Sequence, residues 1–274
     1  MNNRNRSEWF VSWFDSVHYH KLYAHRDEAE AARFLDEPIA RLRPGRGARV
    51  LDLGCGAGRH STHLASKGLR VTGMDLAAGS IQEAKKSERA RLRFLQHDMR
   101  VPFGRDTFDY VFNFFTSFGY FEETSEHMAV VRNMAASLRA GGRLVLDYLN
   151  VRHAEATLTP YEVKEIDGVI YRLTRWTDAR HFFKRIVVEG AAGAPRAYVE
   201  RVAKFTLQDF ERMFAPHDLT LEELHGDYRL SAYDSVTSPR MILVARKKGT
   251  GWPRRHAEAR REDPLMRTRT AAGT

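Results

Sequence analysis

A glycine-rich turn and the acid that follows it are the residues of this chain whose types and spacing point most directly to chemistry. Gly54, Gly56 and Gly58 lie in the sequence LDLGCGAG, directly after a short apolar run. Glycine has no Cβ, so a ligand can lie close against the backbone of such a turn. Asp75 lies 21 residues after Gly54, where a carboxylate can accept both hydroxyl groups of a ribose. This pattern predicts a site for a nucleoside-containing ligand.

The spacing of the glycines distinguishes among the known nucleotide-binding turns. A dinucleotide fingerprint, G-x-G-x-x-G, would need glycine at the position that Arg59 occupies. A phosphate-binding P-loop would end in Gly-Lys-Ser or Gly-Lys-Thr, and the turn has no such ending. A tight connection between a strand and a helix that binds no ligand is the alternative interpretation of the turn. The pattern is G-x-G-x-G, so neither of these two common motifs is met.

This turn strongly resembles the first motif of the class I S-adenosylmethionine-dependent methyltransferases. That motif is an acid, one residue and Gly-x-Gly-x-Gly, matched here by Asp52, Gly54, Gly56 and Gly58. The second motif of the family, an acid that closes the second strand, is matched by Asp75. The resemblance extends over almost all of the first 150 residues. It implies S-adenosyl-L-methionine as cofactor and S-adenosyl-L-homocysteine as product.

The resemblance also implies which residues bind the adenine. In the family an acid after the third strand receives the adenine amino group, and Asp98 is its counterpart. The next backbone amide, that of Met99, would face the ring nitrogen. Leu76 follows the ribose acid and would lie against the adenine.

The methionine end of the cofactor is implied by two other segments. Asn113 and Phe114 lie where the family lines the cofactor, mainly through the backbone. Tyr19, with Tyr23 as an alternate, and Arg26 match an aromatic residue and an arginine before the family's lid helix, and an arginine suits the cofactor's carboxylate. The complete set of implied cofactor-binding residues is Tyr19, Arg26, Gly54, Cys55, Gly56, Asp75, Leu76, Asp98, Met99, Asn113 and Phe114.

Candidates for the transfer step are fewer. The segment after the fourth strand faces the methyl group in the family, and Tyr120 is the candidate there for a group near the acceptor. This segment lacks the Asn/Asp-Pro-Pro-Tyr/Phe signature of the adenine, cytosine and glutamine amide methyltransferases, which argues against those acceptors. A hydroxyl acceptor benefits from a general base, for which His20 and His153, and also His18, are candidates. Packing or surface exposure is the alternative explanation for each. We identify no metal site.

The expected fold is α/β: a Rossmann-like, seven-stranded mixed sheet with helices on both faces and a small inserted antiparallel β cap. The nearly continuous apolar run of TFDYVFNFF predicts a strand buried on both faces. The family places its last strand antiparallel between the fifth and the sixth, which here would be the segment PRMILVARKK.

Helix boundaries are expected from glycine, proline and capping residues. A helix over about residues 60–67 should stop at Gly68, and one over about 122–139 should stop at Gly141-Gly142. Ser80 is a candidate N-cap. Pro38 should kink the N-terminal helix or split it in two.

The domain organisation follows from these elements. Residues 1–45 should form an N-terminal lid and helix, and residues 46–151 with 205–248 the cofactor-binding domain. Residues 152–204 alternate like strands with a hairpin turn at Asp167-Gly168, and resemble the inserted cap of glycine and amino-sugar N-methyltransferases, which covers the substrate or forms a dimer contact. Residues 249–274 are expected to be a basic, disordered tail.

The amino-acid composition limits which partners and which cellular location are expected. The net charge is +9, but nine Lys or Arg against three acids in residues 246–274 account for +6 of it, so the high charge is weak evidence for a nucleic-acid substrate. One cysteine, Cys55, excludes an internal disulfide and favours a cytoplasmic location. The polar N-terminus and the lack of a long apolar run predict no signal peptide and no membrane association.

The sequence thus predicts a methyltransferase that acts on a nitrogen or oxygen of a small molecule, with a possible homodimer through the cap. An RNA or protein methyltransferase that uses the basic tail is the first alternative. A non-catalytic protein that binds S-adenosylmethionine is the second.

Overall fold

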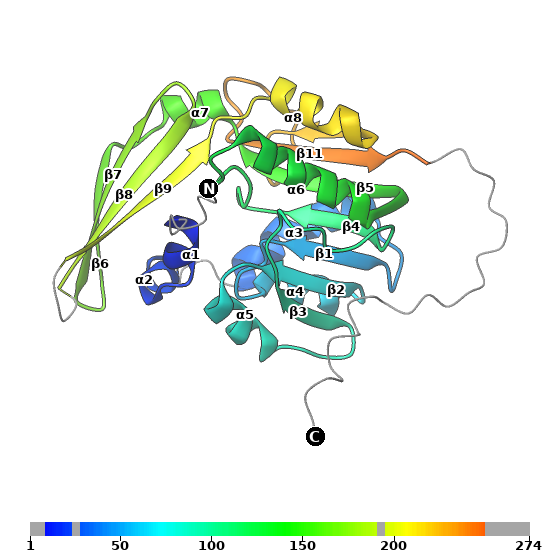
Figure 1. The fold of residues 1–274 in the computed structure, drawn as a ribbon, viewed down its shortest axis with the longest axis horizontal. Helices are drawn as coiled ribbons and strands as arrows, with labels where there is room; N and C mark the ends of the chain where they lie inside the picture. The colour runs from blue at the N-terminus through cyan, green and yellow to red at the C-terminus, as the bar shows by residue number, and fades with distance from the viewer. Residues whose placement is uncertain (1–8, 24–27, 191–194, 250–274) are drawn as a thin grey trace, which may run out of the picture.

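The computed structural model describes residues 9–23, 28–190 and 195–249, and no side chains for residues 28–33. Its main body is a seven-stranded sheet in the order β10-β11-β5-β4-β1-β2-β3 (Figure 1). The strands are β1 Arg49–Leu53, β2 Arg70–Asp75, β3 Leu92–Gln96, β4 Phe108–Asn113, β5 Leu138–Leu149, β10 Leu219–His225 and β11 Arg240–Lys247. β11 alone is antiparallel, to β5 and to β10, as predicted.

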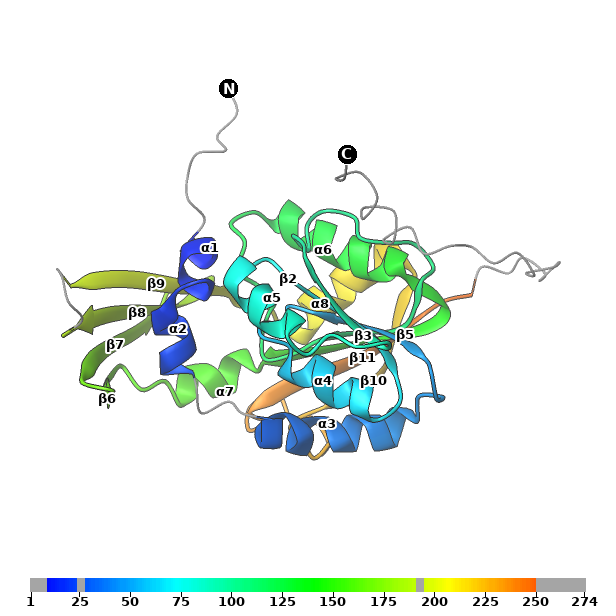
Figure 2. The same ribbon diagram turned by 90° about the horizontal axis from the view of Figure 1, so that it is seen from below.

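Helices cover both faces of this sheet, and Figure 2 shows α3 and α4 on one side and α6 and α8 on the other. Neighbouring residues of a strand point to opposite faces, so Val50 packs with the α3, α4 and α5 side and Leu51 with the α6 and α8 side. The helices are α3 Glu28–Leu42, α4 Arg59–Ser66, α5 Ala78–Lys85, α6 Thr124–Ser137, α7 Val151–Ala156, α8 Leu207–Phe214 and the 3-10 helix η1 Ala215–His217.

Three boundaries differ from expectation. α3 is one helix through Pro38, so the predicted split into two helices is wrong, because burial of Phe34 and Leu35 outweighs the hydrogen bond that proline cannot donate. The predicted kink stays a prediction. α5 begins at Ala78, so Ser80 is buried inside the helix and is not its N-cap, and Asp15 accepts the first-turn amide of Gly79.

The third difference concerns α6, which ends at Ser137 and passes directly into β5, so Gly141 and Gly142 lie inside the strand. A Cβ on Gly142 would lie 3.0 Å from the carbonyl oxygen of Asp109, so close strand packing explains this glycine better than helix termination. The predicted stop of α4 is confirmed, since Gly68 follows the C-cap with φ of +86°.

The predicted antiparallel insertion is a separate four-stranded sheet in the order β6-β7-β8-β9. Its strands are β6 Tyr161–Ile166, β7 Val169–Thr177, β8 His181–Glu189 and β9 Arg196–Ala203. The hairpin between β6 and β7 turns at Asp167 and Gly168, both with positive φ. Its role as a substrate cover or dimer contact stays a prediction.

Two short helices, α1 Trp9–Phe14 and α2 Val17–Leu22, lie between the two sheets (Figures 1 and 2). Trp13 and Leu22 pack with Tyr171, Leu173 and Ile186 in a small core on the inner face of the four-stranded sheet. The N-terminal segment is therefore anchored to the insertion. Within the described part of the chain, none of the helices has the length and apolar character needed to cross a membrane.

Candidate active site

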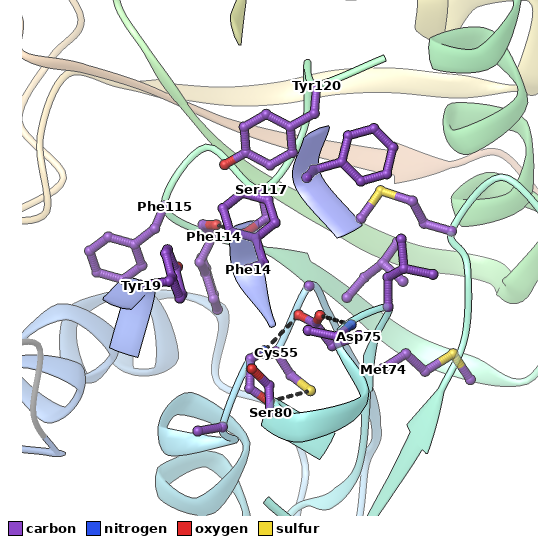
Figure 3. Close-up of a pocket in the computed structure, with 18 of the residues that line it drawn as sticks. Phe14, Tyr19, Cys55, Met74, Asp75, Ser80, Phe114, Phe115, Ser117 and Tyr120 are labelled. Atoms are coloured by element: carbon purple, nitrogen blue, oxygen red, sulfur yellow. Dashed lines mark hydrogen bonds between the residues drawn. The ribbon is translucent and has the colours of Figure 1, made fainter. Parts of the chain in front are cut away.

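A cavity of about 360 Å³ lies at the carboxyl ends of β1, β2 and β4, beneath α1 and α2 (Figure 3). The glycine-rich turn after β1 and Asp75 at the end of β2 line one part of it. The segment after β4 and aromatic residues of the N-terminal helices line another part. Open α/β sheets bind their ligands at this edge, and the volume falls in the usual range for small-molecule pockets.

The glycine-rich turn is fixed by hydrogen bonds to β2, and its backbone at Gly56 is open to the cavity. The amides of Gly54 and Cys55 both donate to the carbonyl oxygen of Met74, at 2.7 and 3.1 Å. Gly54 has φ of +79°, and a Cβ there would lie 2.7 Å from the Cβ of Ser117. At Gly56, with φ of +53°, a Cβ would meet no atom within 4 Å. The backbone at Gly56 therefore leaves free space for a ligand.

Asp75 is held in place by the turn that it faces. Its Oδ2 accepts the amide of Gly56 at 2.8 Å, and its Oδ1 accepts the amide of Ala77 at 2.9 Å. Burial raises the pKa of the Asp75 carboxyl, and the hydrogen bonds from these amides oppose that shift. Each carboxylate oxygen has a further lone pair, so the group can still accept hydrogen bonds from a ligand.

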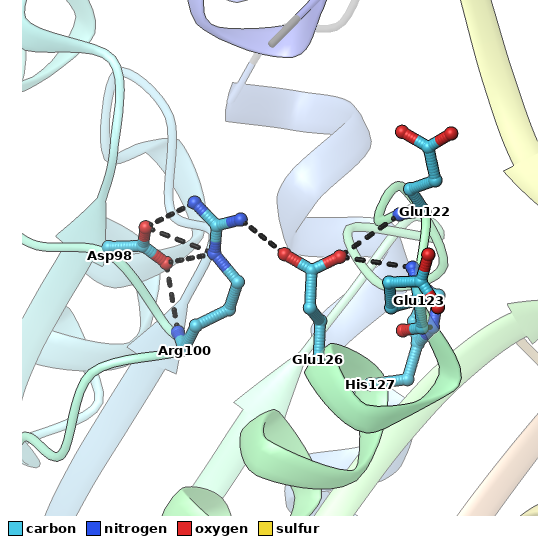
Figure 4. A network of polar contacts seen from close by, with 6 residues as sticks. All are labelled: Asp98, Arg100, Glu122, Glu123, Glu126 and His127. Carbon is cyan, nitrogen blue, oxygen red and sulfur yellow. Dashed lines mark hydrogen bonds and ion pairs between the residues drawn. The ribbon is translucent and has the colours of Figure 1, made fainter. Parts of the chain in front are cut away.

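Asp98 also lines the cavity, but its carboxylate is already paired (Figure 4). Arg100 donates to Asp98 from Nε and from Nη2, the latter at 2.6 Å, and its Nη1 binds Glu126 at 2.7 Å. Burial raises the pKa of Asp98, but the hydrogen bonds and charge of Arg100 outweigh it and lower the pKa overall. Arg100 was not anticipated from the sequence.

Aromatic side chains form the upper wall of the cavity. The ring of Phe14 lies 5.0 Å from that of Tyr19 and 5.2 Å from that of Tyr120, and Tyr19 lies 4.9 Å from Tyr23. All four rings line the cavity, and we call Phe14, Tyr19, Tyr23 and Tyr120 the aromatic wall.

The segment between α1 and α2 is also attached to the main body, because Asp15, which follows α1, accepts the amide of Gly79 in α5 at 2.6 Å.

The four-stranded sheet contacts Tyr23 of this wall through Glu200 and Lys184. Oε1 of Glu200 in β9 accepts from Trp13 Nε1 at 2.7 Å and from the Tyr23 hydroxyl at 3.1 Å. Lys184 in β8 donates to the same Tyr23 hydroxyl and lies 3.5 Å from Glu200. The position of Tyr23 therefore depends on β8 and β9.

The segment after β4 is held by a buried ion pair that the sequence analysis missed. Phe115 and Thr116 have φ of +54° and +58°, a region that non-glycine residues rarely adopt. Asp147, which is 0% exposed, accepts the Phe115 amide at 2.7 Å and Arg240 Nε at 2.8 Å. Arg240 Nη2 also donates to the Thr116 hydroxyl at 2.9 Å. An acid inside the apolar run RLVLDYLN was the signal, because such a buried charge needs a partner.

The structure brings together most of the predicted site residues. Those that line the cavity are Tyr19, Gly54, Cys55, Gly56, Asp75, Leu76, Asp98, Met99 and Phe114, together with the transfer candidates Tyr120 and His20. Further lining residues that we had not proposed include Phe10, Phe14, Arg59, His60, Ser80, His97, Phe115, Ser117 and Phe121. The binding roles of all of them stay predictions.

Three predicted residues that the structure describes are not among those that line the cavity: Asn113, His153 and His18, whose Nδ1 lies 3.4 Å from the Tyr171 hydroxyl. The side chain of Asn113 is buried, and its Nδ2 donates to the carbonyl oxygen of Leu53 at 2.8 Å, which joins β4 to β1. His153 lies on α7 and does not line the cavity. Arg26 lies outside the described residues.

Comparison with known proteins agrees with this geometry. Residues 50–142 match the family model described as a methyltransferase domain. The chain is 26% identical over 215 residues to the cypemycin N-terminal methyltransferase of a Streptomyces species, covering 76% of this chain and 87% of that protein. It is 29% identical over 221 residues to a ubiquinone biosynthesis O-methyltransferase of Xanthomonas campestris, covering 72% and 86%.

A solved structure shows the same likeness over nearly its whole length. It is an amino pentose methyltransferase from Micromonospora echinaspora, involved in calicheamicin biosynthesis, with S-adenosylmethionine bound. The TM-score is 0.63 at 25% sequence identity, and the match covers 85% of this chain and 98% of that one.

Proposed function

Because this chain is a class I S-adenosylmethionine-dependent methyltransferase, we propose that it methylates the amino nitrogen of a small molecule held against the aromatic wall. The observation that carries this proposal is the shape of the cavity. One connected space of about 360 Å³ joins the glycine-rich turn to the aromatic wall beneath α1 and α2. A cofactor and a small acceptor can therefore meet in it, whereas a folded macromolecule would first have to displace both helices.

The residues around the turn fit the cofactor. S-adenosylmethionine, when bound, supplies a methyl group that its sulfonium already activates. We propose that Asp75 accepts the ribose hydroxyls and that the open backbone at Gly56 lies against the ligand. Leu76 and Met99 would border the adenine. We propose that Asp98 binds the adenine amino group through its carboxylate, which Arg100 keeps ionised by lowering its pKa.

The aromatic wall favours an amine over an alcohol. Aromatic faces attract cations, so Phe14, Tyr19 and Tyr120 can concentrate and orient an ammonium group before it loses its proton. Two of the relatives carry names that mention the cypemycin N-terminus and an amino pentose, both of which have amino groups. A third is named as an O-methyltransferase, so hydroxyl acceptors belong in the same test.

An amine attacks only in its neutral form, so its proton must leave before the methyl group is transferred. We propose that His20 takes this proton, and its position in the cavity lining and its exposure to solvent support that role. The other protein contribution is positioning: α1 and α2 cover the cavity and exclude water, while the wall orients the acceptor.

The test is an acceptor screen with matched amines and alcohols, with methyl transfer followed by mass spectrometry. We expect transfer to amines, with kcat/KM rising with pH until the acceptor is neutral. Phe14→Leu removes an aromatic face worth about 1–2 kcal/mol to a bound cation, so KM for the acceptor should rise about tenfold. Phe14→Tyr keeps the ring and is the control.

Titration of both variants with S-adenosylhomocysteine separates acceptor effects from cofactor effects, and its affinity should not change. Transfer to alcohols alone would refute the amine proposal. An equal KM in Phe14→Leu and Phe14→Tyr would remove the aromatic wall from acceptor binding.

A further inference from the structure

A second cavity, of about 500 Å³, lies at the edge of the seven-stranded sheet opposite the methyl-transfer cavity. We propose that it binds a ligand that carries several phosphate groups. Its lining, which we call the arginine pocket, consists of Arg46, Gly47, Arg49, Arg70, Arg91, Asp109 and Arg139. This inference is independent of the acceptor proposed above.

The sheet topology gathers these arginines from separate parts of the chain. Arg49 begins β1, Arg70 begins β2 and Arg91 directly precedes β3. Arg139 is the second residue of β5, and Arg46 lies in the loop before β1. The amino-terminal ends of parallel strands meet at one edge, so the pocket faces away from α1 and α2. The register places Arg49 directly beside Arg70, so two like charges are held together.

The pocket has far more positive than negative charge. Asp109 is its single acid, and it accepts Arg139 Nη1 at 3.0 Å and the backbone amide of Arg49 at 2.7 Å. Five arginines less one aspartate leave an excess of four positive charges. Arg91 Nη1 donates to the carbonyl oxygen of Gly68 at 3.2 Å, which positions its guanidinium without neutralising it. Within the described ranges, no carboxylate pairs with Arg46 or Arg70.

At the same edge of the sheet, a neighbouring pair of arginines has its positive charge partly balanced by a glutamate. Arg143 and Arg246 lie opposite each other on β5 and β11. Both bind Glu222, at 2.8 and 3.4 Å. The chain thus provides an acid beside these two arginines but not beside Arg46 or Arg70. That uncompensated charge is the feature that a ligand would satisfy.

Phosphate groups fit this charge better than other anions. The planar guanidinium binds phosphate through two parallel hydrogen bonds and stays charged at every physiological pH. One phosphate monoester carries a charge of about −2, which would balance only half of the excess in the pocket. A ligand with several linked phosphates, either a free polyphosphate compound or a nucleic-acid backbone, would balance it fully.

The experiment is a calorimetric titration of the full chain with sodium tripolyphosphate, and with inorganic phosphate in parallel. The double variant Arg49→Gln/Arg70→Gln removes two charges from the pocket. Arg143→Gln/Arg246→Gln removes two charges from the same edge outside it and is the matched control. We expect one-site binding of tripolyphosphate that weakens at least about tenfold in the pocket variant and less than about twofold in the control.

Binding of S-adenosylhomocysteine to each variant verifies that the fold is intact. A short single-stranded RNA distinguishes the two phosphate sources: if it binds more tightly than tripolyphosphate and is weakened by the same variant, the ligand is a nucleic acid. Tripolyphosphate binding without RNA binding assigns a free polyphosphate compound. The absence of saturable binding of either probe would overturn the proposal. Equal weakening by both double variants would also overturn it, because binding would then depend on the overall positive charge of this edge and not on the arginine pocket.

Discussion

Asp52 should make the stability of this protein fall as the pH rises, and Asp52→Asn should remove that effect. The side chain is 1% exposed, and its Oδ2 accepts a hydrogen bond from the Ser61 hydroxyl at 2.6 Å. Burial raises its pKa to about 6, the hydrogen bond from Ser61 opposes the shift, and the charge of Asp75 adds to it. Asparagine has the same shape but does not ionise.

The size of the effect follows from the two pKa values. An aspartate in an unfolded chain has a pKa of about 3.9, so the folded state holds its proton over about two further pH units. Between these values the folded state binds a proton that the unfolded state has lost, so stability decreases with rising pH. At 1.36 kcal/mol per unit, the loss is about 3 kcal/mol and is complete above pH 6.

Urea denaturation followed by circular dichroism at pH 4 and pH 8 measures this change. The free energy of unfolding of Asp52→Asn, relative to the parent, should be higher at pH 8 than at pH 4 by about 3 kcal/mol. Asp106→Asn, at an exposed position, is the control and should show no such difference. A relative stability of Asp52→Asn that is the same at both pH values would refute the reasoning.

Three other predictions address the cofactor and the segment after β4. Asp75→Ala should weaken binding of S-adenosylhomocysteine by about 3 kcal/mol in calorimetry, because two ribose hydroxyls lose a charged acceptor; unchanged affinity would remove Asp75 from the site. Asp147→Ala should lower the free energy of urea unfolding by about 3–5 kcal/mol, because Arg240 is left buried without its partner. The double variant Asp147→Leu/Arg240→Met should regain most of that loss, and a further loss would contradict the ion-pair account. Tyr120→Phe keeps the ring, so the affinity for S-adenosylhomocysteine should stay within about twofold, and a larger change would place the hydroxyl against the cofactor.

The parts of the fold that the sequence predicted depend on local requirements. Gly54 and Gly56 adopt positive φ, a constraint that one residue type reveals by itself. Gly68 after α4 and the turn at Asp167 and Gly168 belong to the same class. The apolar runs TFDYVFNFF and PRMILVARKK were enough to predict two strands of the main sheet, which are β4 and β11.

The parts that the sequence did not predict depend on contacts between distant residues. In the first turn of α5, the amide of Gly79 donates to Asp15, which lies 64 positions earlier in the chain, and Ser80 is buried inside the helix. The pairing of Asp147 with Arg240 joins residues 93 positions apart. No local pattern identifies such a partner, although the acid within β5 signalled that one must exist.

The attachment of α1 and α2 to the four-stranded sheet has a consequence for the evolution of acceptor choice. The side of the cavity that faces the glycine-rich turn is built by β1, β2 and β4, whereas Tyr23 is positioned by Glu200 and Lys184 from β8 and β9. Substitutions in β8 and β9 can therefore reshape the acceptor side while the donor side stays intact. Selection, or an engineer who seeks a new acceptor, can work on the inserted strands without risking the residues around Asp75.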